Sequence, residues 1–116
     1  MKKVFQSTAT DCLRACVASI TEEDKVPDFS SSHISWMSNM RRWLTRHGFA
    51  TKVVDDCGKI DRRCYSIVAV DPFNFKGGTF AHAVVMRGGK VVHDPARRKI
   101  KKRHKLVYGL EIRRAK

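Results

Sequence analysis

The chain has 116 residues, 42% of them hydrophobic, and a formal net charge of +13. This composition excludes a disordered chain, because disordered chains lack the apolar and aromatic side chains that build a core. No segment approaches the run of about 18 apolar residues that a membrane span needs, and the polar sequence after Lys3 excludes a signal peptide. We therefore expect one cytoplasmic domain without a membrane span.

Two helices are predicted in the N-terminal half of the chain. The first begins at Thr10 or Asp11 and ends near Glu23, because apolar residues recur there at i, i+3, i+4 and i+7. The second covers residues 33–47, where a broad apolar face alternates with arginines that point away from it.

After the second helix the pattern becomes typical of strands. The segments FATKVV (49–54), YSIVAV (65–70) and FAHAVVM (80–86) are rich in β-branched or aromatic residues. The sequence RGGK predicts a hairpin turn, VVHDP (91–95) its return strand, and KLVYGLEI (105–112) a last strand. Two helices followed by an antiparallel sheet indicate an α+β fold, with the N-terminal helices packed on the sheet.

Positive charge is concentrated in the last 20 residues, where ten basic residues stand against one acid. Such a segment attracts nucleic acid, an acidic protein or another anionic surface, or it is a solvated tail. We divide the chain into a domain of residues 1–96 and a basic C-terminal extension of residues 97–116 that includes the last strand. The residues expected to contact an anionic partner are Arg97, Arg98, Lys99, Lys101, Lys102, Arg103 and Lys105.

The four cysteines raise the alternatives of disulfides and a metal site. Thiols usually stay reduced in a cytoplasmic protein. The pairs Cys12/Cys16 and Cys57/Cys64 are separated by three and six residues, a poor match to structural zinc sites. We expect free thiols, no metal and no cofactor.

Cys12 opens the first predicted helix, and the positive end of a helix stabilises a thiolate. A thiolate attacks a carbonyl, while a nearby imidazole takes the thiol proton and later gives it to the leaving amine. His82 interrupts an otherwise apolar strand. A histidine in such a position is, taken by itself, more often a packing residue. Asp94 on the return strand, however, can orient His82 as a base. Gln6 can donate a hydrogen bond to the oxyanion beside the Cys12 N–H.

The hairpin register decides whether His82 and Asp94 share a face. A two-residue glycine turn pairs Ala83 with Asp94 and places the two side chains on opposite faces. A three-residue turn, or a bulge with the same effect, pairs Val84 with Asp94 and brings the aspartate to the His82 face, within roughly 7 Å. A catalytic pair therefore predicts the three-residue turn or a bulge.

The motifs QSTATDCLRAC, HAVV and VVHDP resemble those of papain-like cysteine peptidases related to the bacteriocin-leader-processing (double-glycine) domains, and those of stand-alone bacterial and phage proteins. The resemblance covers about residues 5–95 and implies a papain-like fold. It also implies Cys12 as nucleophile, His82 as general base and acid, Asp94 as orienting acid and Gln6 as oxyanion donor. The chain departs from the family by its basic extension, its short segment before His82, and the absence of an export ATPase, which leaves the substrate open.

Two functions remain open. A cysteine peptidase or related thiol hydrolase would cleave a peptide or isopeptide bond of a peptide or protein substrate through a Cys12 acyl-enzyme. A catalytically silent papain-like scaffold would instead bind nucleic acid or an acidic host protein through its basic segment. Other residues receive structural interpretations: Cys16, Trp36 and Trp43 as packing residues, and His33, His47, His93 and His104 as surface or capping residues.

Overall fold

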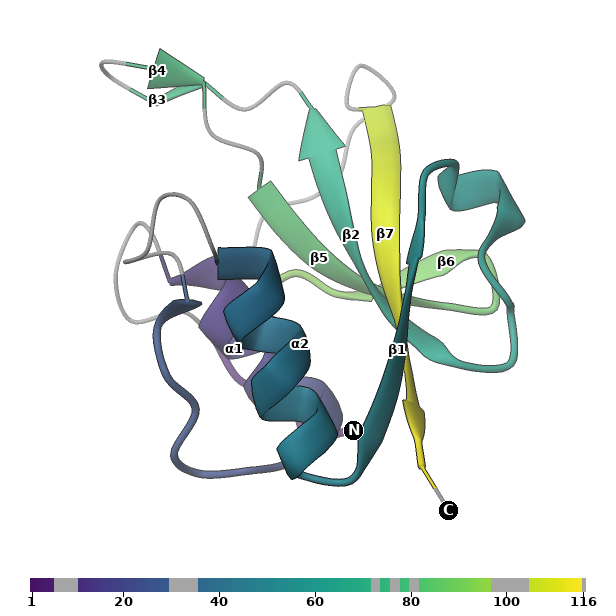
Figure 1. The fold of residues 1–116 in the computed structure, drawn as a ribbon. Helices are drawn as coiled ribbons and strands as arrows, with labels where there is room; N and C mark the ends of the chain where they lie inside the picture. The colour runs from purple at the N-terminus through teal and green to yellow at the C-terminus, as the bar shows by residue number, and fades with distance from the viewer. Residues whose placement is uncertain are drawn as a thin grey trace.

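The computed structural model describes residues 1–5, 11–29, 36–71, 74–75, 78–79, 82–96 and 105–115. In this part of the chain, two helices pack on a five-stranded antiparallel sheet, and a two-stranded ribbon is separate from it (Figure 1). The architecture is α+β, as predicted. The elements are α1 (Cys12–Thr21), α2 (Trp36–Arg46), β1 (Phe49–Val54), the 3-10 helix η2 (Cys57–Lys59), β2 (Tyr65–Asp71), β3 (Asn74–Phe75), β4 (Gly78–Thr79), β5 (His82–Arg87), β6 (Lys90–His93) and β7 (Lys105–Arg114).

The strand order of the sheet is β1-β7-β2-β5-β6, and every neighbouring pair is antiparallel. The predicted last strand therefore forms, and it lies inside the sheet between β1 and β2. Its residues Leu110 and Ile112 are buried in the core with the helices. The chain segment assigned to a C-terminal extension thus contributes an interior strand of the sheet, and the boundary drawn at residue 96 separates that strand from its neighbours β1 and β2.

The two helices bury different amounts of surface. Eight of the ten residues of α1 are buried, because its small side chains, such as Ala15 and Ser19, allow close approach on several sides. α1 contacts β5 and β2, whereas α2 contacts β1. α2 is amphipathic and fully buries Met40 and Leu44. α1 is therefore an inner helix, held at the middle of the sheet. No described helix is long and apolar enough to cross a membrane.

The other face of the sheet carries a second, smaller core. Val68 and Val84 are fully buried there, with Ile60 from the β1–β2 connection packed against them. Gly109 of β7 makes this packing possible, because a Cβ at this position would lie 2.6 Å from Cδ1 of Ile60 and 3.1 Å from Cγ2 of Val68. The absence of a side chain at Gly109 lets the connection close over the sheet.

We expect Gly109→Ala to lower the free energy of unfolding by about 1–3 kcal/mol, the usual cost of overpacking a core. Urea denaturation of the variant and the wild type measures this difference. Gly58→Ala is the control, because the nearest atom to its added Cβ is the exposed carboxylate of Asp56 at 3.3 Å. Equal effects of the two substitutions would contradict the packing role of Gly109.

Candidate active site

His82 and Asp94 form a short, buried hydrogen bond. Nε2 of His82 lies 2.6 Å from Oδ1 of Asp94. The two side chains are 3% and 8% exposed, respectively, so little water competes for the contact. The distance lies at the short end of charge-assisted hydrogen bonds, which are typically about 2.7–2.9 Å between a charged nitrogen and a carboxylate oxygen.

A bulge in the β5–β6 hairpin produces this contact. The turn itself has two residues, and both glycines have positive φ, 65° and 77°, which is typical of a type I′ turn. Such a turn alone would place His82 and Asp94 on opposite faces. Between Val85 and Met86, however, the register shifts by one residue. The bulge confirms the sequence prediction that the strand pairing must shift for the two residues to meet.

Cys12 completes the chain of contacts from the helical layer. It is the first residue of α1 and is 1% exposed. The thiol of Cys12 is near enough to His82 to contribute to the raised pKa of the ring, while Asp94 occupies Nε2 of the same ring. The first N–H groups of a helix lack intrahelical partners and carry partial positive charge. Cys12, His82 and Asp94 thus stand in the order used by acyl-transfer triads.

The surroundings of His82 favour its charged form. Burial by itself lowers the pKa of His82, but the hydrogen bond that its ring donates to Asp94, the neighbouring Cys12 and the charges of both residues outweigh burial and raise the pKa to about 9. At neutral pH the ring is therefore an imidazolium. In this state the histidine already holds the proton needed by a leaving amine.

The carboxylate of Asp94 is oriented by its own backbone. Its Oδ1 also accepts a hydrogen bond from the N–H of Ala96 at 2.9 Å, an Asx-type turn. Pro95 between them is almost completely buried. Oδ2 is buried and has no hydrogen-bond partner in the described part of the chain. The carboxylate therefore keeps its direction toward His82 without a further side chain to hold it.

Cys16 lies one helical turn after Cys12 and is fully buried. Burial, followed by the negative charges of Cys12 and Asp94, raises the pKa of the Cys16 thiol well above its usual value. The predicted packing role of Cys16 is confirmed by its place in the main core. The two cysteines of α1 are therefore chemically distinct although they share one face of the helix.

Arg14 is a residue near the site that the sequence analysis missed. Asp11 precedes Cys12 at the N-cap position, but its side chain makes no capping hydrogen bond. Its Oδ2 instead accepts hydrogen bonds from Nε and Nη2 of Arg14 at 3.0 and 2.7 Å. The ion pair offsets a negative charge that would oppose a thiolate on the next residue. The i, i+3 spacing of opposite charges was the available signal.

His93 is not the surface or capping residue that the sequence predicted. It is 4% exposed, and its Nε2 lies 2.6 Å from the carbonyl oxygen of Val4. Its ring packs edge-on against Phe5, while the hydroxyl of Ser19 accepts a hydrogen bond from the N–H of Val4. The prediction was wrong because the partner is a main-chain atom 89 residues away in sequence. These contacts anchor the segment that leads to Gln6.

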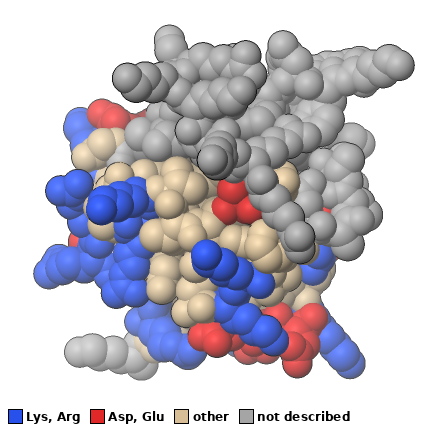
Figure 2. Space-filling view, turned by 180° about the vertical axis from the view of Figure 1, so that it is seen from behind, with Lys and Arg blue, Asp and Glu red and all other residues tan. Residues whose placement is uncertain are grey.

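Several predicted residues lie outside the described part of the chain. They are Gln6, His33, Arg97, Arg98, Lys99, Lys101, Lys102, Arg103 and His104, and of Lys105 only the backbone in β7 is described. His47 does cap its helix, with Nδ1 2.8 Å from the Trp43 carbonyl oxygen, and both tryptophans pack at the edge of the core. On the face seen in Figure 2, lysine and arginine side chains are spread widely, with acids among them.

The described thiols of Cys12, Cys16 and Cys64 are free. Within the described ranges, no group of three or more His, Cys, Asp or Glu residues could hold a metal ion. Comparisons with models of protein families, with curated proteins and with solved structures found no match. Function is therefore inferred from the geometry of Cys12, His82 and Asp94.

We expect the protonated His82 to stabilise the fold in a pH-dependent way. Its pKa is raised to about 9 in the folded protein and is about 6.5 in an unfolded chain. The stabilisation is therefore complete below about pH 6.5 and is lost as the pH rises toward 9. The difference in Tm between wild type and His82→Gln should shrink over this interval. With Asp94→Asn as background, the decline should be smaller and should end at a lower pH, because the pKa of His82 in the folded protein loses the contribution of Asp94. A difference that grows with pH would contradict the assignment.

Proposed function

We propose that this protein is a cysteine peptidase or a related thiol hydrolase that cleaves a peptide or isopeptide bond through an acyl-enzyme on Cys12. The observation that carries the proposal is the buried hydrogen bond between His82 and Asp94, beside a buried Cys12 that opens a helix and contributes to the raised pKa of the histidine. A histidine that only packs in a core needs one partner for its ring, whereas His82 joins a carboxylate to a thiol at a helix N-terminus. That combination is the one that activates a nucleophilic cysteine.

In the proposed reaction the Cys12 thiolate attacks the carbonyl carbon, and a sulfur–carbon bond forms. The resulting oxyanion accepts hydrogen bonds from the N-terminal N–H of α1 and, as the family resemblance implies, from Gln6. When the carbon–nitrogen bond breaks, His82 gives its proton to the leaving amine. Water then attacks the thioester, neutral His82 takes the water proton, and the carbon–sulfur bond breaks to restore the thiolate–imidazolium pair.

The arrangement of elements supports a papain-like fold as part of the proposal. A helix that begins with the cysteine packs against an antiparallel sheet, and the histidine and aspartate come from its β5–β6 hairpin. The chain order Cys12, His82, Asp94 is that of the family motifs. A small thiol hydrolase of the stand-alone bacterial or phage type, acting in the cytoplasm, agrees with these features.

The burial of Cys12 adds one requirement. A thiol that is 1% exposed meets a peptide carbonyl only after the atoms that cover it move. Local opening of the atoms that cover Cys12, which occurs in the free protein and is completed when substrate binds, must therefore precede attack.

Cysteine-by-cysteine labelling with iodoacetamide tests the activated thiolate. We expect Cys12 to react faster than Cys64 at pH 6, and His82→Ala to abolish this advantage. Cys64 is the internal control, because burial raises the pKa of its thiol. Peptide mass spectrometry measures each rate. Equal rates for the two cysteines, unchanged by the histidine substitution, would show that the resting fold contains no activated nucleophile. That result would favour the alternative function, a catalytically silent scaffold that binds an anionic partner.

A search over peptide libraries and whole-cell lysates tests the cleavage itself. We expect wild type to release new N-termini and Cys12→Ala to release none above background, since loss of a nucleophile typically costs several orders of magnitude in kcat. Cys64→Ala is the matched control and should retain activity. Identical products from wild type and Cys12→Ala would contradict an acyl-enzyme on Cys12.

A further inference from the structure

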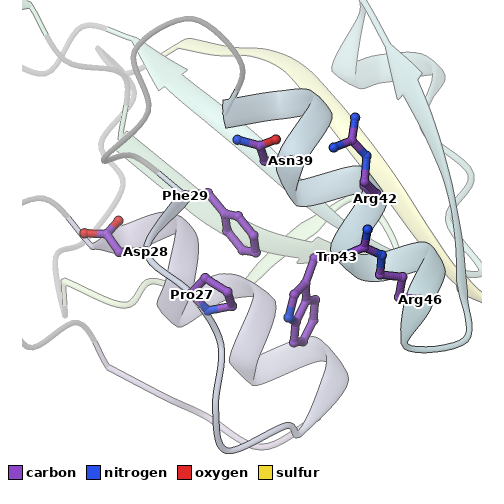
Figure 3. A pocket seen from close by; sticks show the side chains of 7 residues that line it. All are labelled: Pro27, Asp28, Phe29, Asn39, Arg42, Trp43 and Arg46. Carbon is purple, nitrogen blue, oxygen red and sulfur yellow. The ribbon is translucent and has the colours of Figure 1, made fainter.

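A pocket of about 330 Å³ lies in the helical layer, and its lining includes no residue of the triad. One wall comes from the segment that follows α1, and the other comes from the exposed side of α2 (Figure 3). The lining residues are Pro27, Asp28, Phe29, Asn39, Arg42, Trp43 and Arg46. The pocket combines an aromatic floor with a cationic wall.

The cationic wall consists of two arginines that form no ion pair within the described part of the chain. Arg42 and Arg46 lie four residues apart on α2, so their side chains are neighbours on the helix surface. Both are exposed, and no ion pair of either is found in the described part of the chain. Two like charges at this spacing slightly destabilise a helix. A carboxylate placed between them would remove the repulsion and accept hydrogen bonds from both guanidinium groups.

The aromatic floor distinguishes a peptide from a nucleic acid as the occupant. His47 stacks on the Trp43 ring at 3.8 Å between centroids, and Phe29 approaches the same ring edge-on. Because one indole face is already covered, the ring is a poor platform for a stacked base. Trp43 is half-buried and still offers apolar surface to the pocket, while Phe29 is buried beside it.

We propose that this pocket binds an acidic peptide segment, with a carboxylate side chain between Arg42 and Arg46 and a neighbouring apolar side chain against Phe29 and Trp43. The identity of the bound peptide rests on the proposed function: in a peptidase, the acidic segment would belong to the substrate and lie away from the bond that is cleaved. Binding itself requires neither Cys12 nor cleavage.

The test uses the Cys12→Ala protein, so that binding is measured without turnover. The probe is a fluorescein-labelled hexapeptide of alternating glutamate and leucine, followed by fluorescence anisotropy. The double variant Arg42→Gln/Arg46→Gln should weaken binding about tenfold or more, the loss expected for two charge-assisted contacts. Lys52→Gln/Lys59→Gln is the matched control, because it removes the same charge from exposed positions outside the pocket, and its affinity should stay within about twofold.

Two further readouts keep the result specific. In the wild-type pocket, the indole N–H signal of Trp43 in an NMR spectrum should shift on peptide addition, while that of Trp36 should not. The same hexapeptide with glutamine for glutamate should bind at least about tenfold more weakly. Equal loss in the two double variants, equal binding of the glutamine peptide, or the absence of any binding would overturn the proposal.

Oligothymidylate of equal charge serves as the comparison probe. If it binds more tightly than the peptide and loses affinity in Arg42→Gln/Arg46→Gln, the pocket serves nucleic acid and the acidic-peptide proposal fails. Because peptide binding is measured without Cys12, an inactive triad leaves the binding result intact. Failure of the pocket and failure of the proposed hydrolase are therefore separate outcomes.

Discussion

The hydrogen bond between His82 and Asp94 links the local geometry of a hairpin to the charge state of the whole site. It exists because a bulge places both side chains on one face of the β5–β6 hairpin. Once formed, it holds a buried cation beside a buried carboxylate, and removal of either partner leaves an uncompensated charge in a low-dielectric interior. The register of the hairpin thus permits the contact, and the contact in turn sets the protonation state and the direction of the imidazole.

The rest of the fold supports this contact from two sides. β7 joins β1 to β2, and β2 in turn pairs with β5, so the C-terminal strand stabilises the strand that carries His82. From the other side, the small residues of α1 allow the helix to lie close to β5 and bring its N-terminus to the histidine. His93, one residue before Asp94, anchors the N-terminal segment through the carbonyl of Val4. The N-terminal segment therefore packs against the residue before Asp94, whereas the C-terminal strand supports β5 through β2.

Local patterns predicted most of the elements and failed where a contact joins distant segments. The strand FATKVV and the hairpin strands form as expected, because alternation and turn residues act over a few positions. For the first helix the sequence predicted one buried face, but α1 is buried on nearly all sides. His93 and the Asp11–Arg14 pair were missed, because the first depends on a main-chain partner far along the chain and the second on the direction of a side chain.

The sequence by itself determined the α+β class, the position of Cys12 at a helix start, and the condition under which His82 and Asp94 could meet. These follow from periodicity, from turn chemistry and from the two-residue repeat of a strand, all of which are local. Only the tertiary structure decided that the condition is met by a bulge, that β7 is an interior strand, and that Arg42, Arg46 and Trp43 line one pocket. Such features depend on which segments pack together, and packing is a balance over the whole chain that no short stretch encodes.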